Sequence, residues 1–433
     1  MSLFGAMNAA ISGLSSQSKS LANISNNLAN SQTVGYKRID TNFMDLVTQS
    51  SRTANAAGSV VARPDYTNTI QGTITQSDNT LALAISGQGF FSVASQNGTV
   101  NGQPTFDDRQ FYTRAGDFSL NSDGYMVNSQ GYFLQGWPID ATTGEPNRTQ
   151  LNPIRVSQQV FNPVATSSVE LTANLPAGSD STVTTQVQIY DSLGTAHTAT
   201  LSFTPVTGSS EWDMSISLPD ETTATTRTVR VQFGNAATPA TTSGLLGSFA
   251  SAVGVTPSTS TVTGDPATLT FTTDFGEGAQ SITLNLGEIG QSTGLTQYSG
   301  TEFSVSNISQ NGVPPGSYSG LSIGDNGDVT INYDNGQSRV ISRIPVVTFS
   351  NPDALQRLDG QAFMRTPESG EARVTQIGSD GAGKLVVGSV EASNVDIATE
   401  FSKLIVAQRA YTANTKVVTA SDEMLQDTIN MSR

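Results

Sequence analysis

Hydrophobic residues near both ends of the chain recur at intervals of three and four residues. The first set is Met7, Ile11, Leu14, Ser18, Leu21, Ser25 and Leu28. The second set is Ile397, Phe401, Leu404, Gln408, Tyr411, Thr415, Val418, Asp422, Leu425 and Ile429. Heptad spacing places each set on one stripe of a helix. The pattern predicts one helix from Met1 to about Asn30, and a second that begins near Asn394 or Asp396 and runs toward the end of the chain.

The long stretch between these helices alternates hydrophobic and polar residues, which is typical of β-strands. Residues 31–70 show little periodicity and predict an extended linker with some strand character. The run NTLALAISGQGFFSV predicts a hairpin that turns at Ser86–Gly89. A second hairpin is predicted in FYTRAGDFSLNSDGYMV, because its Asp123-Gly124 pair supplies the positive φ of a tight turn.

The composition and residue pattern of the chain change at both borders of residues 146–311. This segment opens with several prolines and continues as Thr- and Ser-rich strands, and the run NGVPPG closes it before short strands with Asn-Gly turns resume. An inserted domain is the economical explanation. We therefore expect a mainly β fold of nested domains, with the helices of both ends pairing as a coiled-coil-like region. The expected domains are 1–30 with 394–433 for terminal helices, 31–70 for the linker, 71–145 with 312–393 for a first β-domain, and 146–311 for an inserted outer β-domain.

The helical stripes are the strongest candidates for a functional surface. From periodicity alone, they could pair within one chain and cover a domain's core, or they could meet copies of themselves in an assembly. The candidate interface residues are Met7, Ile11, Leu14, Leu21, Leu28, Ile397, Phe401, Leu404, Tyr411, Val418, Leu425 and Ile429. Tyr36, Lys37 and Arg38 follow the first helix as a basic-aromatic cluster. They are expected either to contact a neighbouring subunit's acidic positions or to form an ordinary solvated turn.

Composition narrows the chemistry that this chain of 433 residues can perform. Charged residues make up 13% of it and its net charge is −15, which argues against nucleic acid and anionic membranes as partners. It has no cysteine and one histidine, so thiolate sites are excluded and His-based metal sites are not expected. The acids Asp325, Asp328 and Asp334 depart from the spacing of a calcium loop and fit hairpin turns better. We expect no catalytic, cofactor or metal site.

The start of the chain, MSLFGAMNAAISGLSSQSKS, has no basic segment followed by an apolar core, so a cleaved secretory leader is not expected. No apolar run approaches the roughly 20 residues needed to cross a membrane. The sequence therefore predicts a protein that stays inside the cell or leaves it without a cleaved leader.

Four segments carry a resemblance to a known family. They are NISNNLANSQTVGYKR, ISGQGFFSV, YTRAGDFSLNSDGYMV and VEASNVDIATEFSKLIVAQRAYTANTKVVTASDEMLQDTINM. In this order along the chain they resemble the bacterial flagellar rod and hook family. The match covers both ends and the first β-domain, while residues 146–311 match no motif that we can quote. Within the family, the length of the chain and its large insert favour the hook over the distal rod.

The resemblance implies a structural role and no enzyme activity. Members of this family pack their terminal helices around a central channel, with the first β-domain outside them and the inserted domain outermost. We accordingly expect a homopolymer that forms a flexible curved tube and transmits torque from rod to filament. The implied partners are the distal rod protein, the hook cap protein, the hook-filament junction protein and the flagellar export apparatus. The implied location is the extracellular hook, reached by type III export without a cleaved signal peptide.

Two other functions compete with this one. A distal rod or other axial protein would share the same ends and differ in the insert. A secreted β-rich glycan-processing enzyme should show paired acids in a cleft with aromatic platforms. The chain has only two tryptophans, Trp137 and Trp212, and no convincing acid pair.

Overall fold

The computed structural model describes residues 3–50, 55–140, 143–157 and 160–431. The chain divides into two compact units. The first unit comprises Met1–Gln158, Gly320–Asn332 and Ser338–Arg433, and the second comprises Gln159–Ser319 and Tyr333–Gln337. The fold is mainly β with a helix at each end, which confirms the predicted class.

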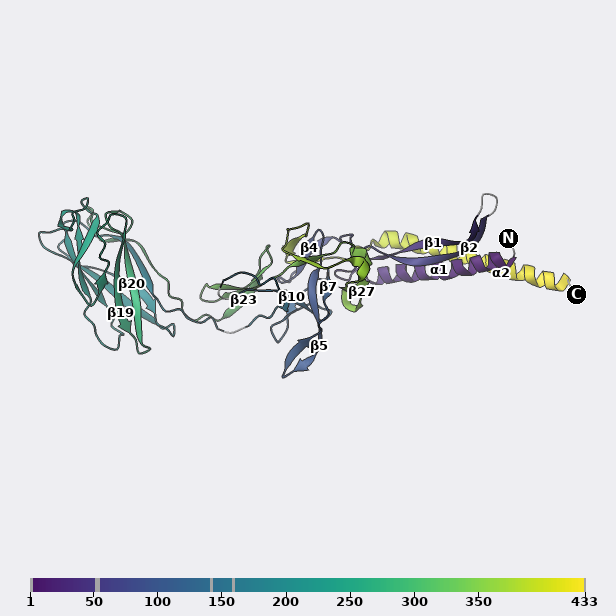
Figure 1. The fold of residues 1–433 in the computed structure, drawn as a ribbon, viewed down its shortest axis with the longest axis horizontal. Coiled ribbons are helices and arrows are strands. Elements are labelled where there is room, and N and C mark those ends of the chain that lie inside the picture. The colour runs from purple at the N-terminus through teal and green to yellow at the C-terminus, as the bar shows by residue number, and fades with distance from the viewer. Residues whose placement is uncertain (1–2, 51–54, 141–142, 158–159, 432–433) are drawn as a thin grey trace. The chain divides into compact units, whose positions relative to one another are not determined.

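Both predicted terminal helices are present in the first unit. Helix α1 spans Leu3–Ala29 and helix α2 spans Ile397–Met431. They lie side by side with both chain ends at the same end of the pair (Figure 1). Asp396 caps α2, since its side chain accepts a hydrogen bond from the backbone N–H of Thr399 at 2.8 Å.

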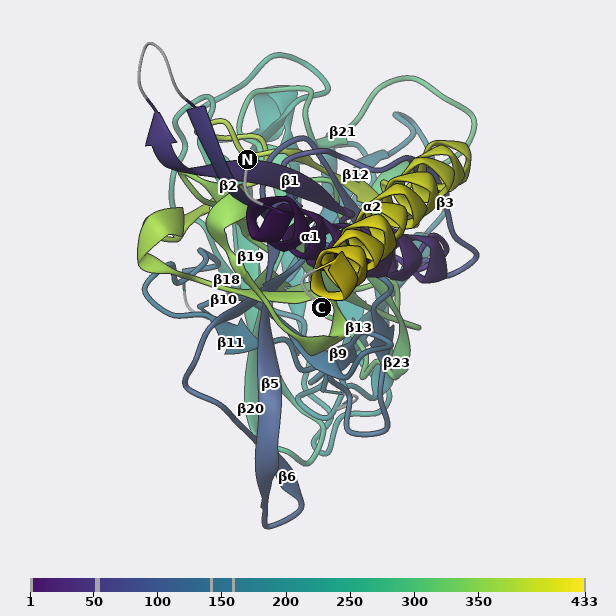
Figure 2. The ribbon, with the colours of Figure 1, turned by 90° about the vertical axis from the view of Figure 1, so that its right-hand side faces the viewer.

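The segment predicted as an extended linker folds largely into a β-hairpin. Strands β1 (Ile39–Ser50) and β2 (Asn55–Tyr66) pair antiparallel, with Ile39 opposite Tyr66. Figure 2 shows the hairpin along one side of α1 and α2 along another. The hydroxyl of Ser16 donates to the carbonyl of Val60 at 2.9 Å. Sequence periodicity missed the pairing because the hydrophobic alternation of these strands is weak and α1 supplies their support.

The β-domain of the first unit is built on a sheet whose main strand order is β23-β24-β25-β10-β5-β7-β28-β27. Its strands are β5 (Phe91–Val100), β6 (Gln103–Phe106), β7 (Phe111–Thr113), β8 (Ser119–Leu120), β9 (Met126–Val127), β10 (Tyr132–Pro138), β11 (Asn152–Pro153), β23 (Tyr318–Ile323), β24 (Asp328–Tyr333), β25 (Ser338–Arg343), β27 (Gln356–Arg357) and β28 (Ala362–Met364). Smaller pairs are β3 (Ile74–Gln76) with β31 (Ser389–Glu391), β4 (Leu83–Ser86) with β30 (Lys384–Val387), and β26 (Val346–Thr348) with β29 (Arg373–Thr375). Short 3-10 turns occupy Pro352–Ala354, Asp359–Gln361 and Pro367–Ser369.

One predicted hairpin is correct and the other is wrong. Strands β8 and β9 pair across the Asp123-Gly124 turn, where Gly124 has a φ of 80°. The strands around Ser86–Gly89 also exist, but β4 pairs with β30 near the end of the chain, and β5 pairs with β7 and β10. A run of buried apolar residues predicts a strand but does not identify the strands that pair with it. Here β4 pairs with β30, which comes from near the other end of the chain.

The second unit is a sandwich of two sheets. One sheet has the main order β18-β19-β20-β12-β21, with β22 beside β12, and the other has the order β13-β14-β15-β16-β17. The strands are β12 (Ser168–Asn174), β13 (Val183–Tyr190), β14 (Ala196–Pro205), β15 (Glu211–Ser217), β16 (Thr228–Phe233), β17 (Leu246–Val253), β18 (Thr256–Pro257), β19 (Pro266–Asp274), β20 (Ala279–Glu288), β21 (Leu295–Thr296) and β22 (Ser304–Gln310), with a 3-10 turn at Gly234–Ala236. Alternate residues of both sheets meet in one hydrophobic cluster that includes Phe203, Trp212, Met214, Phe233 and Leu284.

Candidate assembly interface

Helices α1 and α2 run antiparallel, and most of the residues that α1 buries are small or polar. The buried positions of α1 recur every three or four residues and are Ala10, Gly13, Ser16, Ser20, Ile24 and Asn27. A Cβ atom added to Gly13 would lie 2.9 Å from the Nδ2 atom of Asn414 on α2. The side chain of Asn414 therefore packs directly against α1 at Gly13, and a larger residue there would require this side chain to move.

The predicted stripe of α1 lies beside this buried stripe. Met7, Leu14, Leu21 and Leu28 are half-buried, and Ile11 is 48% exposed. Ile11, Leu14, Leu21 and Leu28 each lie one residue after a buried position, at the edge of the buried stripe. They remain a predicted interface with other copies.

On α2, the predicted stripe divides between two faces. Leu404, Val418 and Leu425 are half-buried and turn toward α1. Four others are exposed, namely Ile397, Phe401, Tyr411 and Ile429. The buried stripe instead takes in Glu400, Ala407 and Ser421. The intramolecular pair thus uses only part of the apolar surface that the heptads provide.

A buried asparagine connects both helices and the hairpin. Asn27 is fully buried, and its Nδ2 donates to the carbonyl of Ile39 at 2.9 Å and to Oε2 of Glu400 at 3.1 Å. Its Oδ1 accepts from the N–H of Ile39 at 2.9 Å and from the hydroxyl of Tyr36 at 3.0 Å. Every hydrogen-bonding position of the amide is satisfied. Asn27 therefore fixes the alignment of α1, α2 and β1 at one point.

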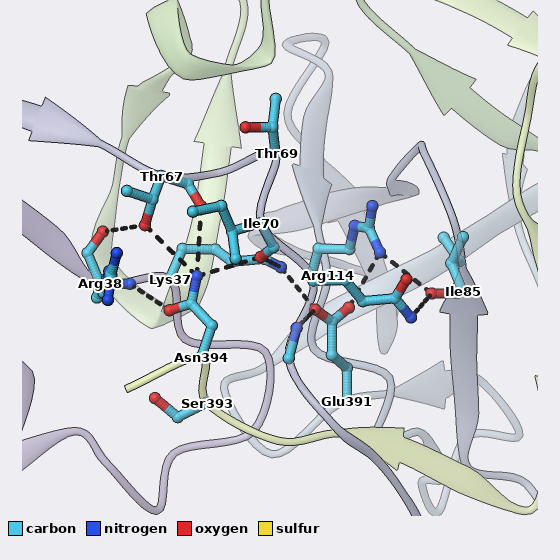
Figure 3. A network of polar contacts seen from close by, with 12 residues as sticks. Lys37, Arg38, Thr67, Thr69, Ile70, Ile85, Arg114, Glu391, Ser393 and Asn394 are labelled. Atoms are coloured by element: carbon cyan, nitrogen blue, oxygen red, sulfur yellow. Dashed lines mark hydrogen bonds and ion pairs between the residues drawn. The ribbon is translucent and has the colours of Figure 1, made fainter. Parts of the chain in front are cut away.

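A second polar cluster joins the hairpin region to the β-domain. Glu391 accepts from Lys37 at 2.5 Å and from Arg114 at 3.0 Å, and the side chains of all three are at most 2% exposed (Figure 3). Lys37 also donates to the carbonyl of Ile70 at 2.6 Å, and Arg114 donates to the carbonyls of Ile85 at 3.2 Å and Gly87 at 2.7 Å. The cluster thus holds two cations and one carboxylate away from water.

Burial lowers the pKa of both cations in this cluster. Desolvation lowers the pKa of Lys37, and the neighbouring Arg114 lowers it further, while Glu391 acts in the opposite direction. Desolvation also lowers the pKa of Arg114, again opposed by Glu391. Glu391 is therefore essential to keeping either cation inside the protein.

The basic-aromatic cluster predicted at the end of the first helix is largely internal. Tyr36 and Lys37 are buried within the chain, so neither is a solvated turn residue nor free to reach a neighbouring subunit. Arg38 stays partly accessible and pairs with Asp40 at 3.1 Å. Of these three residues, Arg38 alone is accessible for the predicted contact with another subunit.

Sequence reasoning missed Asn27, Arg114, Glu391 and Glu400 as structural residues. Glu391 lies 354 positions from Lys37 along the chain, and no local spacing links them. The one available signal was a polar Asn within the heptad region of the first helix, where an exposed or capping role is the usual expectation.

The remaining candidate chemistry of the described residues concerns metals, membranes and exposed aromatic side chains. The described residues contain no group of three or more His, Asp or Glu side chains placed to hold a metal. Within the same ranges, no helix is both long enough and apolar enough to span a membrane. Trp137 and Trp212 are both buried and offer no aromatic platform.

Four family models match the chain in order. Their descriptions are "Flagella basal body rod protein" for residues 7–37, "Flagellar hook protein FlgE/F/G D1 domain" for 84–189, "Flagellar basal body protein FlaE D2 domain" for 157–313, and "Flagellar basal body rod FlgEFG protein C-terminal" for 386–431. The flagellar hook protein FlgE of Brucella abortus biovar 1 (strain 9-941) is 32% identical over 446 residues, covering 100% of both chains. The chain belongs to the flagellar hook protein FlgE family.

Other FlgE proteins are similar over nearly the whole length. That of Salmonella typhimurium (strain LT2) is 30% identical over 443 residues, covering 98% of each chain. The solved structure of Helicobacter pylori flagellar hook protein FlgE2 aligns with 73% of this chain and 100% of its own, with a TM-score of 0.48 and 15% identity.

Membership in the FlgE family gives the chain its role. It is a structural subunit of the flagellar hook and forms part of a polymer within the flagellar axis. The Lys37–Glu391 pair joins the two terminal matched segments, since Lys37 ends one and Glu391 lies in the other.

Proposed function

We propose that copies of this hook subunit polymerise through their terminal helices into a flexible curved tube that transmits torque from rod to filament. The observation that carries this proposal is the exposure of apolar helix residues. Ile11 and Phe401 are each 48% exposed, although they belong to the predicted stripes. Ile405, Val406, Val417, Met424 and Ile429 of α2 are exposed as well, and exposed apolar residues gathered on one element mark surfaces that bind other proteins. A homopolymer would bury them against equivalent helices.

The nested domains fit a joint that bends. We propose a terminal helical domain of residues 1–30 with 394–433, a hairpin-containing connection at 31–70, a first β-domain at 71–145 with 312–393, and an outer β-domain at 146–311. Only 13% of the residues are charged, and Ser and Thr are abundant in the strands. Polar contacts between such surfaces can rearrange at lower cost than large apolar interfaces. The connection at 31–70 would set the stiffness of the joint.

The individual binding partners are inferred from the position of a hook subunit in the polymer of the flagellar axis. We propose contacts with the distal rod protein at one end of the hook, and with the hook cap and hook-filament junction proteins at the other. We also propose export by the flagellar apparatus without a cleaved signal peptide. We also propose that the chain is no enzyme and binds neither nucleic acid nor the membrane interior.

The direct test is polymerisation of full-length chains with single changes on the exposed stripes. Ile11→Asp and Phe401→Asp place a charge at exposed positions, so the monomer should keep its fold while polymerisation fails. Val262→Asp is the matched control, because Val262 is also exposed but lies in the second unit. Electron microscopy should reveal curved hollow tubes for the wild type and the control. Tubes of normal length and yield from both stripe variants would overturn the assembly role of the helices.

A further inference from the structure

The methionines of the chain divide between its helical region and its β-sheets. Met126 on β9 and Met214 on β15 are fully buried, and Met364 on β28 is half-buried. On α2, by contrast, Met424 is 59% exposed and Met431 is 88% exposed. An exposed thioether is open to oxidants in solution, whereas a buried one is shielded. The end of α2 is therefore the part of the described chain where methionine sulfur is most accessible.

Met424 and Met431 lie on one exposed face of this helix end. Their spacing of seven residues is close to two helical turns, which places them on the same side of α2. Figure 1 shows α2 extending past the start of α1, so α1 does not cover Met431. Both side chains belong to the apolar helix surface that the proposed polymer would bury.

The neighbours one turn away from Met424 on its exposed side offer no free hydrogen-bond donor. The preceding neighbour is Ala420, and the following ones are Asp427 and Thr428. A carboxylate only accepts hydrogen bonds, and the hydroxyl of Thr428 already donates to the carbonyl of Met424 at 2.7 Å. A sulfoxide at Met424 would therefore be hydrated in the free subunit and would lose this water in an apolar contact.

Peroxides convert methionine to its sulfoxide in one balanced step. The thioether sulfur attacks one peroxide oxygen, so that a sulfur–oxygen bond forms and the oxygen–oxygen bond breaks. Sulfur is oxidised by two electrons, the transferred oxygen gives up its proton, and the other oxygen of hydrogen peroxide leaves as water. The product replaces a flexible apolar side chain with a polar one that accepts hydrogen bonds.

We propose that Met424 and Met431 are the sites at which peroxides block assembly of the free subunit, and that burial in the polymer shields both from the same oxidants. This inference rests on the proposed function, because it assigns a chemical sensitivity to the surface that the polymer would bury. A sulfoxide at either position enters that contact as an unsatisfied acceptor. Reduction of the sulfoxide restores assembly.

The first measurement treats full-length monomer with hydrogen peroxide, removes the oxidant and then induces polymerisation. Peptide mass spectrometry should find sulfoxide at Met424 and Met431, while Met126 and Met214 stay unmodified. The protein concentration needed for polymerisation should rise about tenfold or more, because a buried unsatisfied acceptor weakens association by at least that factor. Reductases for both sulfoxide epimers should return it to the untreated value.

Leucine variants locate the effect, because leucine keeps an apolar side chain of similar volume without the sulfur. Met424→Leu/Met431→Leu should polymerise equally well before and after peroxide. The matched variant Met7→Leu/Met44→Leu changes the methionines of α1 and β1 and should remain as sensitive as the wild type. The reductase experiment uses wild-type protein alone, so it decides the question even if a leucine variant assembles poorly.

Shielding is measured on polymers that have already formed. Polymers given the same peroxide dose as monomers should accumulate sulfoxide at Met424 and Met431 several-fold more slowly. Equal rates in monomer and polymer would overturn the shielding.

The outcomes separate this inference from the proposed function. Unchanged polymerisation of wild-type protein that carries sulfoxide at Met424 and Met431 would overturn the inference. A loss in peroxide-treated Met424→Leu/Met431→Leu equal to that of the wild type would overturn it as well. Both results leave the helical assembly standing, whereas normal polymers from untreated Ile11→Asp and Phe401→Asp would overturn the proposed function itself.

Discussion

The β-sandwich of the second unit and the terminal helical pair are built on opposite principles. The sandwich collects its large side chains in one cluster, where Phe203, Met214 and Phe233 are fully buried. In the described ranges, none of the hydrophobic clusters includes a residue of α1 or α2. The helices bury Ala10, Gly13 and other small or polar groups instead, and leave many of their Ile, Phe, Val and Met side chains in water.

The difference separates folding from assembly. The sandwich gains its stability from its own apolar burial and is complete within one chain. The helical pair is aligned by hydrogen bonds at Asn27 and connected to the β-domain through Glu391, while its apolar surface stays available. Polar contacts specify how the elements pair, and the apolar contacts are left for neighbouring copies.

The largest effect should come from removing the carboxylate that connects the helical region to the β-domain. Glu391→Gln leaves Lys37 and Arg114 buried without a counter-charge, so we expect a loss of about 3–5 kcal/mol. Hydrogen exchange of β31 and α1 should accelerate, while exchange in the sandwich stays unchanged. Lys37→Met is the matched variant, because it leaves one cation paired with one carboxylate and should cost clearly less. Equal losses in both variants would contradict the role given to Glu391.

A matched pair of methionines measures the contrast between the two regions. Met214→Ala removes a fully buried side chain from the sandwich and should cost about 2–5 kcal/mol. Met424→Ala trims an exposed side chain and should change monomer stability by no more than about 0.5 kcal/mol. Denaturant unfolding measures both, and polymerisation should reverse the order, with Met424→Ala the more harmful. Strong destabilisation of the monomer by Met424→Ala would contradict this contrast between the sandwich and the helices.

Substitution of Asn27 tests whether its hydrogen bonds align α1 with α2 and β1, and the neighbouring Asn26 is the control. Asn27→Ala leaves the partners of a buried amide unsatisfied and should cost about 1–3 kcal/mol. Asn26→Ala affects an exposed side chain on the same helix and should be nearly neutral. Helix content and hydrogen exchange of α1 report the difference. Similar behaviour of the two variants would mean that Asn27 does not fix the alignment.

The smallest effect concerns pH. Because burial lowers the pKa of Lys37, the unfolded chain holds this proton more tightly than the folded chain does. The penalty is fully present below the folded pKa, and stability is regained as the pH rises from there toward the ordinary lysine value of 10.5. Unfolding measured across the alkaline range should therefore show a relative gain for the wild type over Lys37→Met. A flat difference between the two proteins would exclude this linkage.

The sequence by itself determined the terminal helices, the mainly β class and the short Asp123-Gly124 hairpin. Each of these follows from local rules, since heptad spacing, strand alternation and turn residues act over a few positions. The long ordered motifs also pointed to the flagellar rod and hook family, and the sequence comparisons identified the chain as a FlgE family member.

Only the tertiary structure decided which elements meet. It paired β4 with β30, folded the expected linker into the β1–β2 hairpin, and buried Lys37 against Glu391 from the other end of the chain. It also selected which side of each heptad helix is covered, because Ala407 and Ser421 face α1 while Phe401 remains exposed. The physical reason is the same in each case. Burial and charge pairing depend on partners distant in sequence, and periodicity carries no information about which partner a surface will find.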